Sequence, residues 1–226
     1  MNATTNKMDM WAVVPVKCLS NSKTRLASVL GRAQRVEFTL AMLHDVLEQL
    51  SRVKNLAGIC ILSDDMHLVK LAGSLGVRIW SDNASDLNHG LQAVSKGLEK
   101  EGYGVMIIPC DVPVARTQDY QRLLDGHREG VTLVEASADG GTNALLCDAG
   151  QEMLFNYGAG SFVAHKREAE QHGIPLTITR IPRLQRDIDR PGDLDWLVNF
   201  NHDCRARDYL LQLFPEARQL EWKQTA

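Results

Sequence analysis

The run Trp11-Ala-Val-Val-Pro-Val16 sets the architecture of this chain, and it continues directly as Lys17-Cys-Leu-Ser-Asn-Ser-Lys-Thr-Arg25. A continuous apolar run is typical of a strand buried on both faces, as in a parallel sheet. The cations Lys17, Lys23 and Arg25 follow it and are separated by small polar side chains. Such a loop is either a solvated basic loop or one that wraps a polyphosphate, with lysine as a point charge and arginine as a bidentate fork.

Strand-like apolar runs and amphipathic helical segments alternate over the first half of the chain. We expect strands at 11–16, 59–62, 77–80 and 104–109, and helices at 32–53, 66–75, 87–98 and 117–128, the last capped by Thr117. This alternation predicts a parallel sheet covered by helices on both faces. Ligands of such folds bind at the carboxyl ends of the strands, so the loops that follow the strands are the places to look for chemistry.

The second half is less regular. It predicts strands at 131–135, 144–147 and 176–181, a loop at 136–143, a helix at 161–172 and a helix opened by Pro191. No stretch resembles a linker, so we expect one domain over residues 1–226. Residues 203–226 form a charged tail that contains several large apolar side chains. This tail is expected to be a docked helix or a contact in a homodimer.

Composition excludes several classes of protein. The chain has 226 residues, of which 44% are hydrophobic, and a net charge of −3, values typical of a globular protein without a basic face for nucleic acid. It contains no apolar run long enough for a membrane span and no secretory signal. The five cysteines, Cys18, Cys60, Cys110, Cys147 and Cys204, are far apart. We therefore expect free thiols and a cytoplasmic protein.

Carboxylates stand at positions suited to a hard cation. Asp111 follows the predicted strand that ends near Pro109, and Asp187-Ile-Asp189 places two carboxylates on one side of an extended segment, about 7 Å apart. Each could equally be a turn or helix-capping residue. Asp64 and Asn88 lie after other strands, where Asn88 could contact a ribose or a base.

Two glycine-bearing loops complete the candidate groups. Asp139-Gly-Gly-Thr-Asn143 offers short donors and acceptors at Thr142 and Asn143, and Tyr157-Gly-Ala-Gly-Ser161 leads into a helix whose amides favour an anion. Ser161 could cap that helix, bind a phosphate, or do both. Five histidines, His44, His67, His127, His172 and His202, are expected to be structural or solvated. His89 and His165 are nearer to the candidate loops.

Taken together, these segments resemble one family, the phospholactate guanylyltransferases of coenzyme F-420 biosynthesis. Val14-Pro-Val-Lys-Cys-Leu-Ser-Asn-Ser-Lys-Thr-Arg-Leu26 resembles the family's opening V-P-V-K-x-L-x-x-A-K-[ST]-R-L. Three later segments are also similar: Asp139-Gly-Gly-Thr-Asn-Ala-Leu-Leu146, Gly158-Ala-Gly-Ser-Phe162 with His165, and Asp187-Ile-Asp189 followed by Pro191-x-Asp-Leu194. The resemblance runs in order from about Trp11 to Leu197.

The resemblance implies a three-layer α/β nucleotidyltransferase fold with a mostly parallel mixed sheet, GTP as the donor, and Mg²⁺. It implies Asp111, Asp187 and Asp189 as metal carboxylates. The remaining expected contacts are Lys17, Lys23, Arg25, Asp64 and Asn88 for the nucleotide, and Thr142, Asn143, Gly158 and Ser161 for the acceptor. The implied acceptor is 2-phospho-L-lactate, phosphoenolpyruvate or 3-phospho-D-glycerate.

The chain departs from the family pattern in three places without losing a charged group. It has Cys110-Asp-Val-Pro113 where A-D-[LV]-P is usual, Cys18 where proline is common, and Asp86-Leu-Asn88 where G-L-N is usual. The implied reaction needs no general base, because the acceptor phosphate is already an anion near pH 7. Its oxygen would attack the α-phosphorus of GTP and expel pyrophosphate, with Lys17, Lys23 and Arg25 neutralising the phosphates.

Two other readings remain open. One is a sugar-1-phosphate or molybdopterin nucleotidyltransferase of the same fold, but these open with L-x-x-G-x-[GS]-x-R-[ML], whose glycines are missing here. The other is a non-catalytic nucleotide-binding module, which would be expected to lose the metal carboxylates. All three candidate carboxylates are present.

Overall fold

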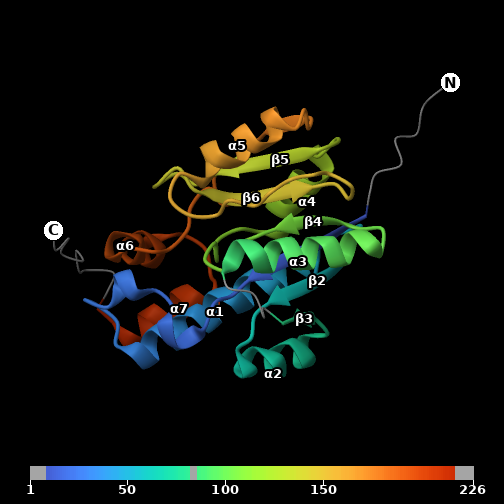
Figure 1. Cartoon of the computed structure of the whole chain (residues 1–226). Coiled ribbons are helices and arrows are strands. Elements are labelled where there is room, and N and C mark those ends of the chain that lie inside the picture. The colour runs from blue at the N-terminus through green and yellow to red at the C-terminus, as the bar shows by residue number, and fades with distance from the viewer. Residues whose placement is uncertain (1–8, 82–85, 217–226) are drawn as a thin grey trace.

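A computed structural model describes residues 9–81 and 86–216 of the chain (Figure 1). The strands are β1 (Met10–Pro15), β2 (Leu56–Leu62), β3 (Arg78–Trp80), β4 (Gly104–Ile107), β5 (Val131–Glu135), β6 (Thr142–Cys147) and β7 (Leu176–Ile178). The helices are α1 (Arg32–Leu50), α2 (Met66–Leu75), α3 (Leu87–Lys100), α4 (Thr117–Gly126), α5 (Ser161–Gln171), α6 (Pro191–Asn199) and α7 (Arg205–Leu213). Two short 3₁₀ turns, Leu19–Asn21 and Thr24–Leu26, shape the loop after β1.

The strands form one seven-stranded sheet in the order β3-β2-β1-β4-β6-β5-β7. The β3, β2, β1 and β4 strands are mutually parallel, whereas β6 runs antiparallel to both β4 and β5. The connection between β5 and β6 is too short for a crossover, and only antiparallel neighbours can be joined in that way. The expected mostly parallel mixed sheet is therefore confirmed, and β6 is the strand that makes it mixed.

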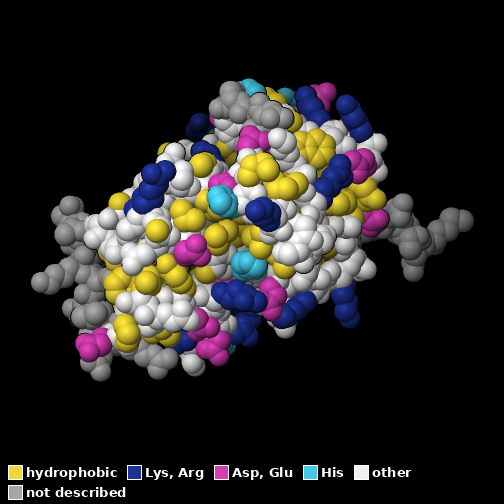
Figure 2. Space-filling view, turned by 90° about the horizontal axis from the view of Figure 1, so that it is seen from below, with side chains coloured by type: hydrophobic (Ala, Val, Ile, Leu, Met, Phe, Trp, Pro, Cys, Tyr) yellow, Lys and Arg dark blue, Asp and Glu magenta, His cyan; other side chains and the backbone are white. Residues whose placement is uncertain are grey.

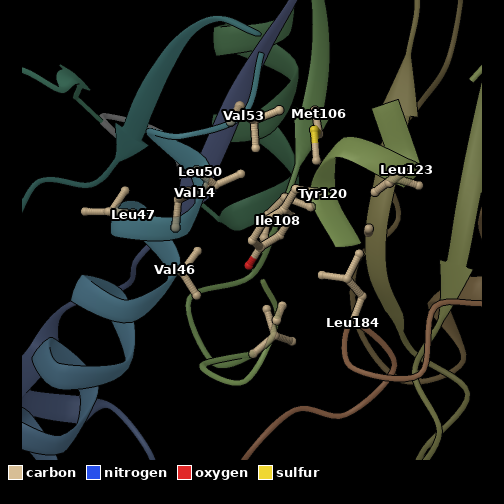
Figure 3. Packing of buried hydrophobic residues seen from close by; sticks show 14 of the residues in the cluster. Val14, Val46, Leu47, Leu50, Val53, Met106, Ile108, Tyr120, Leu123 and Leu184 are labelled. Atoms are coloured by element: carbon tan, nitrogen blue, oxygen red, sulfur yellow. The ribbon is translucent and has the colours of Figure 1, made fainter. Parts of the chain in front are cut away.

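Each face of the sheet carries its own apolar core, because alternate side chains of the buried strands point to opposite faces. On one face, Val14 of β1 packs with Val46 and Leu50 of α1 and with Tyr120 of α4 (Figure 3). On the other face, Val13 of β1 joins the side chains of α3 and α5. The result is the expected three-layer arrangement.

The first part of the charged tail forms a helix that docks on the rest of the protein, which is one of the two arrangements expected for the tail. Helix α7 packs against α1 (Figure 1), and its Ala206 and Leu210 join an apolar cluster with Phe38 of α1. The carboxylate of Asp45 on α1 accepts hydrogen bonds from the backbone N–H groups of Arg205 (2.8 Å) and Ala206 (2.9 Å). These donors belong to the first turn of α7 and would otherwise lack partners. The rest of the tail, 217–226, lies outside the described residues.

Several boundaries differ by a few residues from the sequence-based expectation; α1, for example, ends at Leu50 and not at residue 53. The N-cap of α4 is Arg116 and not Thr117, because the Thr117 hydroxyl instead donates to the backbone carbonyl of Gln49 on α1. Strand β6 begins at Thr142, so Thr142 and Asn143 lie on a strand and not in a loop. Strand β7 ends at Ile178, three residues earlier than expected.

Basic and acidic side chains are interspersed over the face that carries α1, α2 and α7 (Figure 2). Within the described ranges, none of the helices combines the length and the apolar character needed to cross a membrane.

We predict that Asp45→Ala destabilises the protein by about 1–2 kcal/mol, because the first turn of α7 loses both of its acceptors. Urea unfolding of the full chain measures this loss. Glu48→Ala is the matched control, since Glu48 lies on the same helix and makes only partly exposed ion pairs with Arg52 and Arg205. Equal destabilisation by the two substitutions would contradict the capping role of Asp45.

Candidate functional site

The basic loop after β1 delivers one buried ammonium group into a cluster of carboxylates. Lys23 has a φ of 50°, in the left-handed region that residues other than glycine rarely adopt. Its Nζ lies 2.6 Å from Asp111 Oδ2 and 3.3 Å from Asp189 Oδ1, and its side chain is only 7% exposed. Burial alone would lower the pKa of Lys23, but the two carboxylates outweigh burial and hold that pKa above its ordinary value. Lys23 is therefore a permanent cation.

The third cation of the loop, Arg25, forms an ion pair with Asp189 from its exposed position. Burial acts to raise the pKa of Asp189, but Lys23 and Arg25 together hold it below the ordinary aspartate value. Lys17, the first cation of the loop, is exposed directly beyond the end of β1. The structure thus brings Lys23 and Arg25 together with Asp189, while Lys17 lies at the solvent side of the loop.

Asp187 connects this cluster to the beginning of β6. Its Oδ1 accepts a hydrogen bond from Asn143 Nδ2 at 3.1 Å. Burial and the nearby negative charge of Asp111 raise the pKa of Asp187, which means that the two carboxylates repel each other. Oδ1 of Asp111 is buried and has no hydrogen-bond partner among the described residues.

These two features fit a bound cation, because a carboxylate pair that repels itself and an unsatisfied buried oxygen are both relieved by positive charge. The described residues nevertheless contain no ready-made group of three metal ligands. The reason is local: Lys23 Nζ lies between Asp111 and Asp189, and Asn143 holds Asp187. The assignment of all three carboxylates to Mg²⁺ remains a prediction.

A second group of side chains surrounds the start of β6 and the start of α5. Thr142 is buried, and its Oγ1 lies 2.9 Å from Nδ1 of His165 and 3.3 Å from Oγ of Ser161. The backbone N–H of Phe162 donates to the carbonyl of Gly140, so the glycine loop and the helix are joined. Ser161 makes no capping hydrogen bond; the N-cap of α5 is Gly160, with a φ of 68° that favours glycine. The structure therefore removes the capping interpretation of Ser161.

The loop before α5 is held from two sides. The side-chain amide of Asn88 on α3 pairs with the backbone of Tyr157, donating to its carbonyl (3.1 Å) and accepting from its N–H (2.7 Å). On the other side, His165 Nε2 accepts from the backbone N–H of Asn156 at 2.9 Å. Gly158, with a φ of 148°, follows Tyr157 and is exposed. Asn88 thus holds the predicted acceptor loop in place, while its contact with a nucleotide remains a prediction.

Asp64 lies apart from these contacts, because it is exposed after β2 and accepts a hydrogen bond from Ser81 Oγ at 2.6 Å. Its neighbour Asp65 caps α2 and also accepts from the backbone N–H of Leu19 in the basic loop. The aspartate that supports the basic loop is therefore Asp65.

Sequence reasoning missed two polar contacts that shape the acceptor side of the site. Glu168, buried on α5, accepts from the backbone N–H of Leu154, and Gln92 on α3 donates to the carbonyl of Met153. Ser161, His165 and Glu168 have the i, i+4, i+7 spacing of one helix face, and that periodicity was the available signal for Glu168. Gln92 lies one helical turn beyond Asn88, and this spacing on α3 was the signal that could have pointed to Gln92.

A separate hollow of about 670 Å³ lies between α1, α4 and α7. Three of its acidic lining residues are already paired: Asp45 caps α7, Glu48 forms ion pairs with Arg52 and Arg205, and Asp203 forms one with Arg207. The buried unpartnered carboxylate oxygen of Asp111 lies in the other cluster, so we place the candidate site there.

The fold and the carboxylate-bearing strand ends define a class. The structure superimposes on a protein from Desulfovibrio desulfuricans described as a nucleotide-diphospho-sugar transferase, with a TM-score of 0.77, 17% identity, and coverage of 93% of this chain and 97% of the other. The protein thus has the fold of the nucleotide-diphospho-sugar transferases.

Sequence comparison narrows the class. Residues 10–219 match the family described as guanylyl transferase CofC like, and the chain belongs to that family. It is 39% identical over 84% of its length to a phosphoenolpyruvate guanylyltransferase of Roseiflexus castenholzii, 89% of which is covered. It is 29% identical to a 2-phospho-L-lactate guanylyltransferase of Methanothermobacter thermautotrophicus, with 91% of this chain and 92% of the relative covered. A 3-phospho-D-glycerate guanylyltransferase of Colwellia psychrerythraea is 27% identical, with 82% of this chain and 90% of the relative covered.

The buried histidine of the site predicts a pH dependence of stability. Burial lowers the pKa of His165 from 6.5 to about 4, so the unfolded chain takes up a proton at a higher pH than the folded chain does. The free energy of unfolding should therefore fall as the pH drops from about 6.5 to about 4, with His165 contributing about 2 kcal/mol of loss at about pH 5.

The measurement is urea unfolding of the wild type and of His165→Gln at about pH 7 and about pH 5. The variant is less stable at neutral pH, but it should lose less stability on acidification than the wild type, because glutamine does not titrate. Parallel losses in the two proteins would show that His165 is not held neutral.

Proposed function

We propose that this protein transfers the GMP group of GTP to a small phosphorylated carboxylic acid and releases pyrophosphate, a step in the assembly of coenzyme F-420. The observation that carries the proposal is the continuity of the site. Lys23 joins Asp111 to Asp189, and Asn143 joins Asp187 to the strand that bears Thr142. The proposed polyphosphate loop and the proposed acceptor residues thus meet at the segment 187–189, whose Ile188 N–H also donates to the backbone carbonyl of Asp111.

In the proposed reaction a phosphate oxygen of the acceptor forms a bond to the α-phosphorus of GTP, and the bond from that phosphorus to the bridging oxygen of the β-phosphate breaks. The electron pair leaves with pyrophosphate. No proton must be removed from the nucleophile, because the acceptor phosphate is already an anion near pH 7, so the site needs no general base. The protein contributes position and positive charge, supplied by Lys17, Lys23 and Arg25.

Asp111 and Asp187 are the residues proposed to hold a divalent cation, with Asp189 beside them. Their fit rests on the unpartnered buried Oδ1 of Asp111 and on the repulsion that raises the pKa of Asp187. When bound, Mg²⁺ would supply Lewis-acid neutralisation of the phosphate charge. The ammonium of Lys23 already supplies part of the positive charge that would neutralise the phosphates.

The acceptor is proposed to bind between Thr142, Asn143, Gly158 and Ser161. The names of the relatives support three candidates, phosphoenolpyruvate, 2-phospho-L-lactate and 3-phospho-D-glycerate, each with one phosphate and one carboxylate. The test is release of pyrophosphate from GTP with each acid offered separately and then together in competition. A parallel assay with glucose 1-phosphate tests for a sugar-phosphate nucleotidyltransferase. The proposal would be overturned if none of the three acids caused release of pyrophosphate.

We predict that Asp111→Asn lowers kcat by about 100-fold or more, because the substitution removes the charge beside Lys23 while it keeps the size of the side chain. Steady-state pyrophosphate release at saturating Mg²⁺ measures this loss. Asp203→Asn is the control, since the Asp203 side chain is 95% exposed outside the site. An Asp111→Asn enzyme with unchanged kcat would remove Asp111 from the machinery.

For the acceptor pocket, we predict that Thr142→Val lowers kcat/KM for the acceptor roughly 10- to 150-fold, because a hydrogen bond to a charged group contributes about 1.5–3 kcal/mol. The KM for GTP should barely change. The two kinetic constants are measured by varying each substrate at saturation of the other. A weakened GTP site with an intact acceptor site would mean that the two pockets are assigned in reverse.

A further inference from the structure

The acceptor side of the site contains one group whose chemistry the proposed reaction does not use. His165 lies on α5 one turn after Ser161 and is completely buried. Both of its ring nitrogens have partners, the backbone N–H of Asn156 at Nε2 and the hydroxyl of Thr142 at Nδ1. The ring of Tyr157 packs edge-on against it, with the centroids 4.7 Å apart.

These partners determine which nitrogen carries the proton. A backbone N–H can only donate, so Nε2 must accept and carries no proton. A neutral imidazole has one proton and one acceptor, and the proton is therefore on Nδ1. Burial in this apolar surrounding keeps the ring neutral at ordinary pH. Nδ1–H then donates to Oγ1 of Thr142.

The tautomer in turn determines what Thr142 can do. A threonine hydroxyl has one proton and two acceptor positions. His165 Nδ1–H occupies one of these positions, and Ser161 Oγ–H occupies the other at 3.3 Å. What remains is the hydroxyl proton, for which no described side chain or backbone group serves as an acceptor.

We propose that His165 is a positioning residue for Thr142. By donating to Oγ1, it leaves the Thr142 hydroxyl able only to donate a hydrogen bond to the acceptor substrate. Thr142 therefore selects an anionic oxygen, which accepts that bond, and rejects a group that can only donate one. The inference rests on the proposed function of Thr142 as an acceptor contact. The inference adds His165 to that contact: His165 touches neither substrate and acts only by setting the direction of the Thr142 hydrogen bond.

Two substitutions separate this role from simple support of the loop. His165→Asn places an amide N–H near the position of Nδ1, and it keeps the donor to Thr142 but loses the contact with Asn156. His165→Gln reaches the position of Nε2, and it keeps an acceptor for Asn156 but loses the donor to Thr142. The two variants therefore remove opposite halves of the network.

We expect His165→Gln to lower kcat/KM for the acceptor roughly 10- to 100-fold with an unchanged KM for GTP. His165→Asn should stay within about threefold of the wild type for both substrates. Thermal melting of each full-length variant shows that the comparison is made between folded proteins. The reverse pattern, with His165→Asn impaired and His165→Gln normal, would mean that His165 only supports the loop, and equal losses in both variants would also overturn the proposal.

Nitrogen-15 NMR of the labelled wild-type chain gives a readout that does not depend on activity. The His165 signals, identified by their absence in His165→Gln, should report an unprotonated Nε2 and a protonated Nδ1 at neutral pH, and a protonated Nε2 would overturn the inference. A wild type that transfers GMP to none of the acids would instead overturn the proposed function. The two failures are therefore distinguishable.

Discussion

The site depends on the ion pairs that the buried ammonium of Lys23 forms with the partly exposed carboxylates of Asp111 and Asp189. A buried ammonium is tolerated only when it is paired, and removal of one partner of such a pair typically costs about 3–5 kcal/mol. These ion pairs draw the loop after β1 onto the end of β4 and onto the segment before α6. The positive φ of Lys23 is the backbone strain that this attachment requires. The basic loop is thus held close to the carboxylates that accompany it in the proposed chemistry.

The antiparallel direction of strand β6 brings the proposed acceptor residues Thr142 and Asn143 to this cluster. Had β6 run parallel to β4, Thr142 and Asn143 would lie at the opposite edge of the sheet from Asp111. Because β6 starts where β4 ends, Asn143 reaches Asp187 directly. The short connection from β5, with its two glycines, sets that direction. The mixed sheet therefore places the proposed acceptor residues Thr142 and Asn143 next to the carboxylates that hold the basic loop, which a fully parallel sheet would not do.

Much of this could be predicted from the sequence, and the exceptions have a common cause. The helix expected at 66–75 and the buried strand expected at 11–16 follow from local pattern, and both are confirmed, as α2 and β1. Thr117 was expected to cap a helix, and Ser161 to cap a helix, bind a phosphate or do both, yet tertiary partners occupy both hydroxyls. The hydrogen bonds between the Asn88 side chain and the backbone of Tyr157 join residues 69 positions apart, and no local sequence pattern could indicate them. Side-chain assignments fail where a contact between distant segments competes with a local one.

The two halves of the site have opposite electrostatic designs, and this difference suits the two proposed substrates. The loop side offers cations, including the exposed Lys17, because the proposed triphosphate has several charges to neutralise. The acceptor side uses neutral donors in a buried network around Thr142, and the donors are fixed in direction by His165 and Ser161. Neutral donors stabilise a small anion without attracting the larger polyanion into the same pocket. In the proposed reaction, charge would thus separate the nucleotide from the acceptor, and hydrogen-bond direction would select the kind of acceptor oxygen.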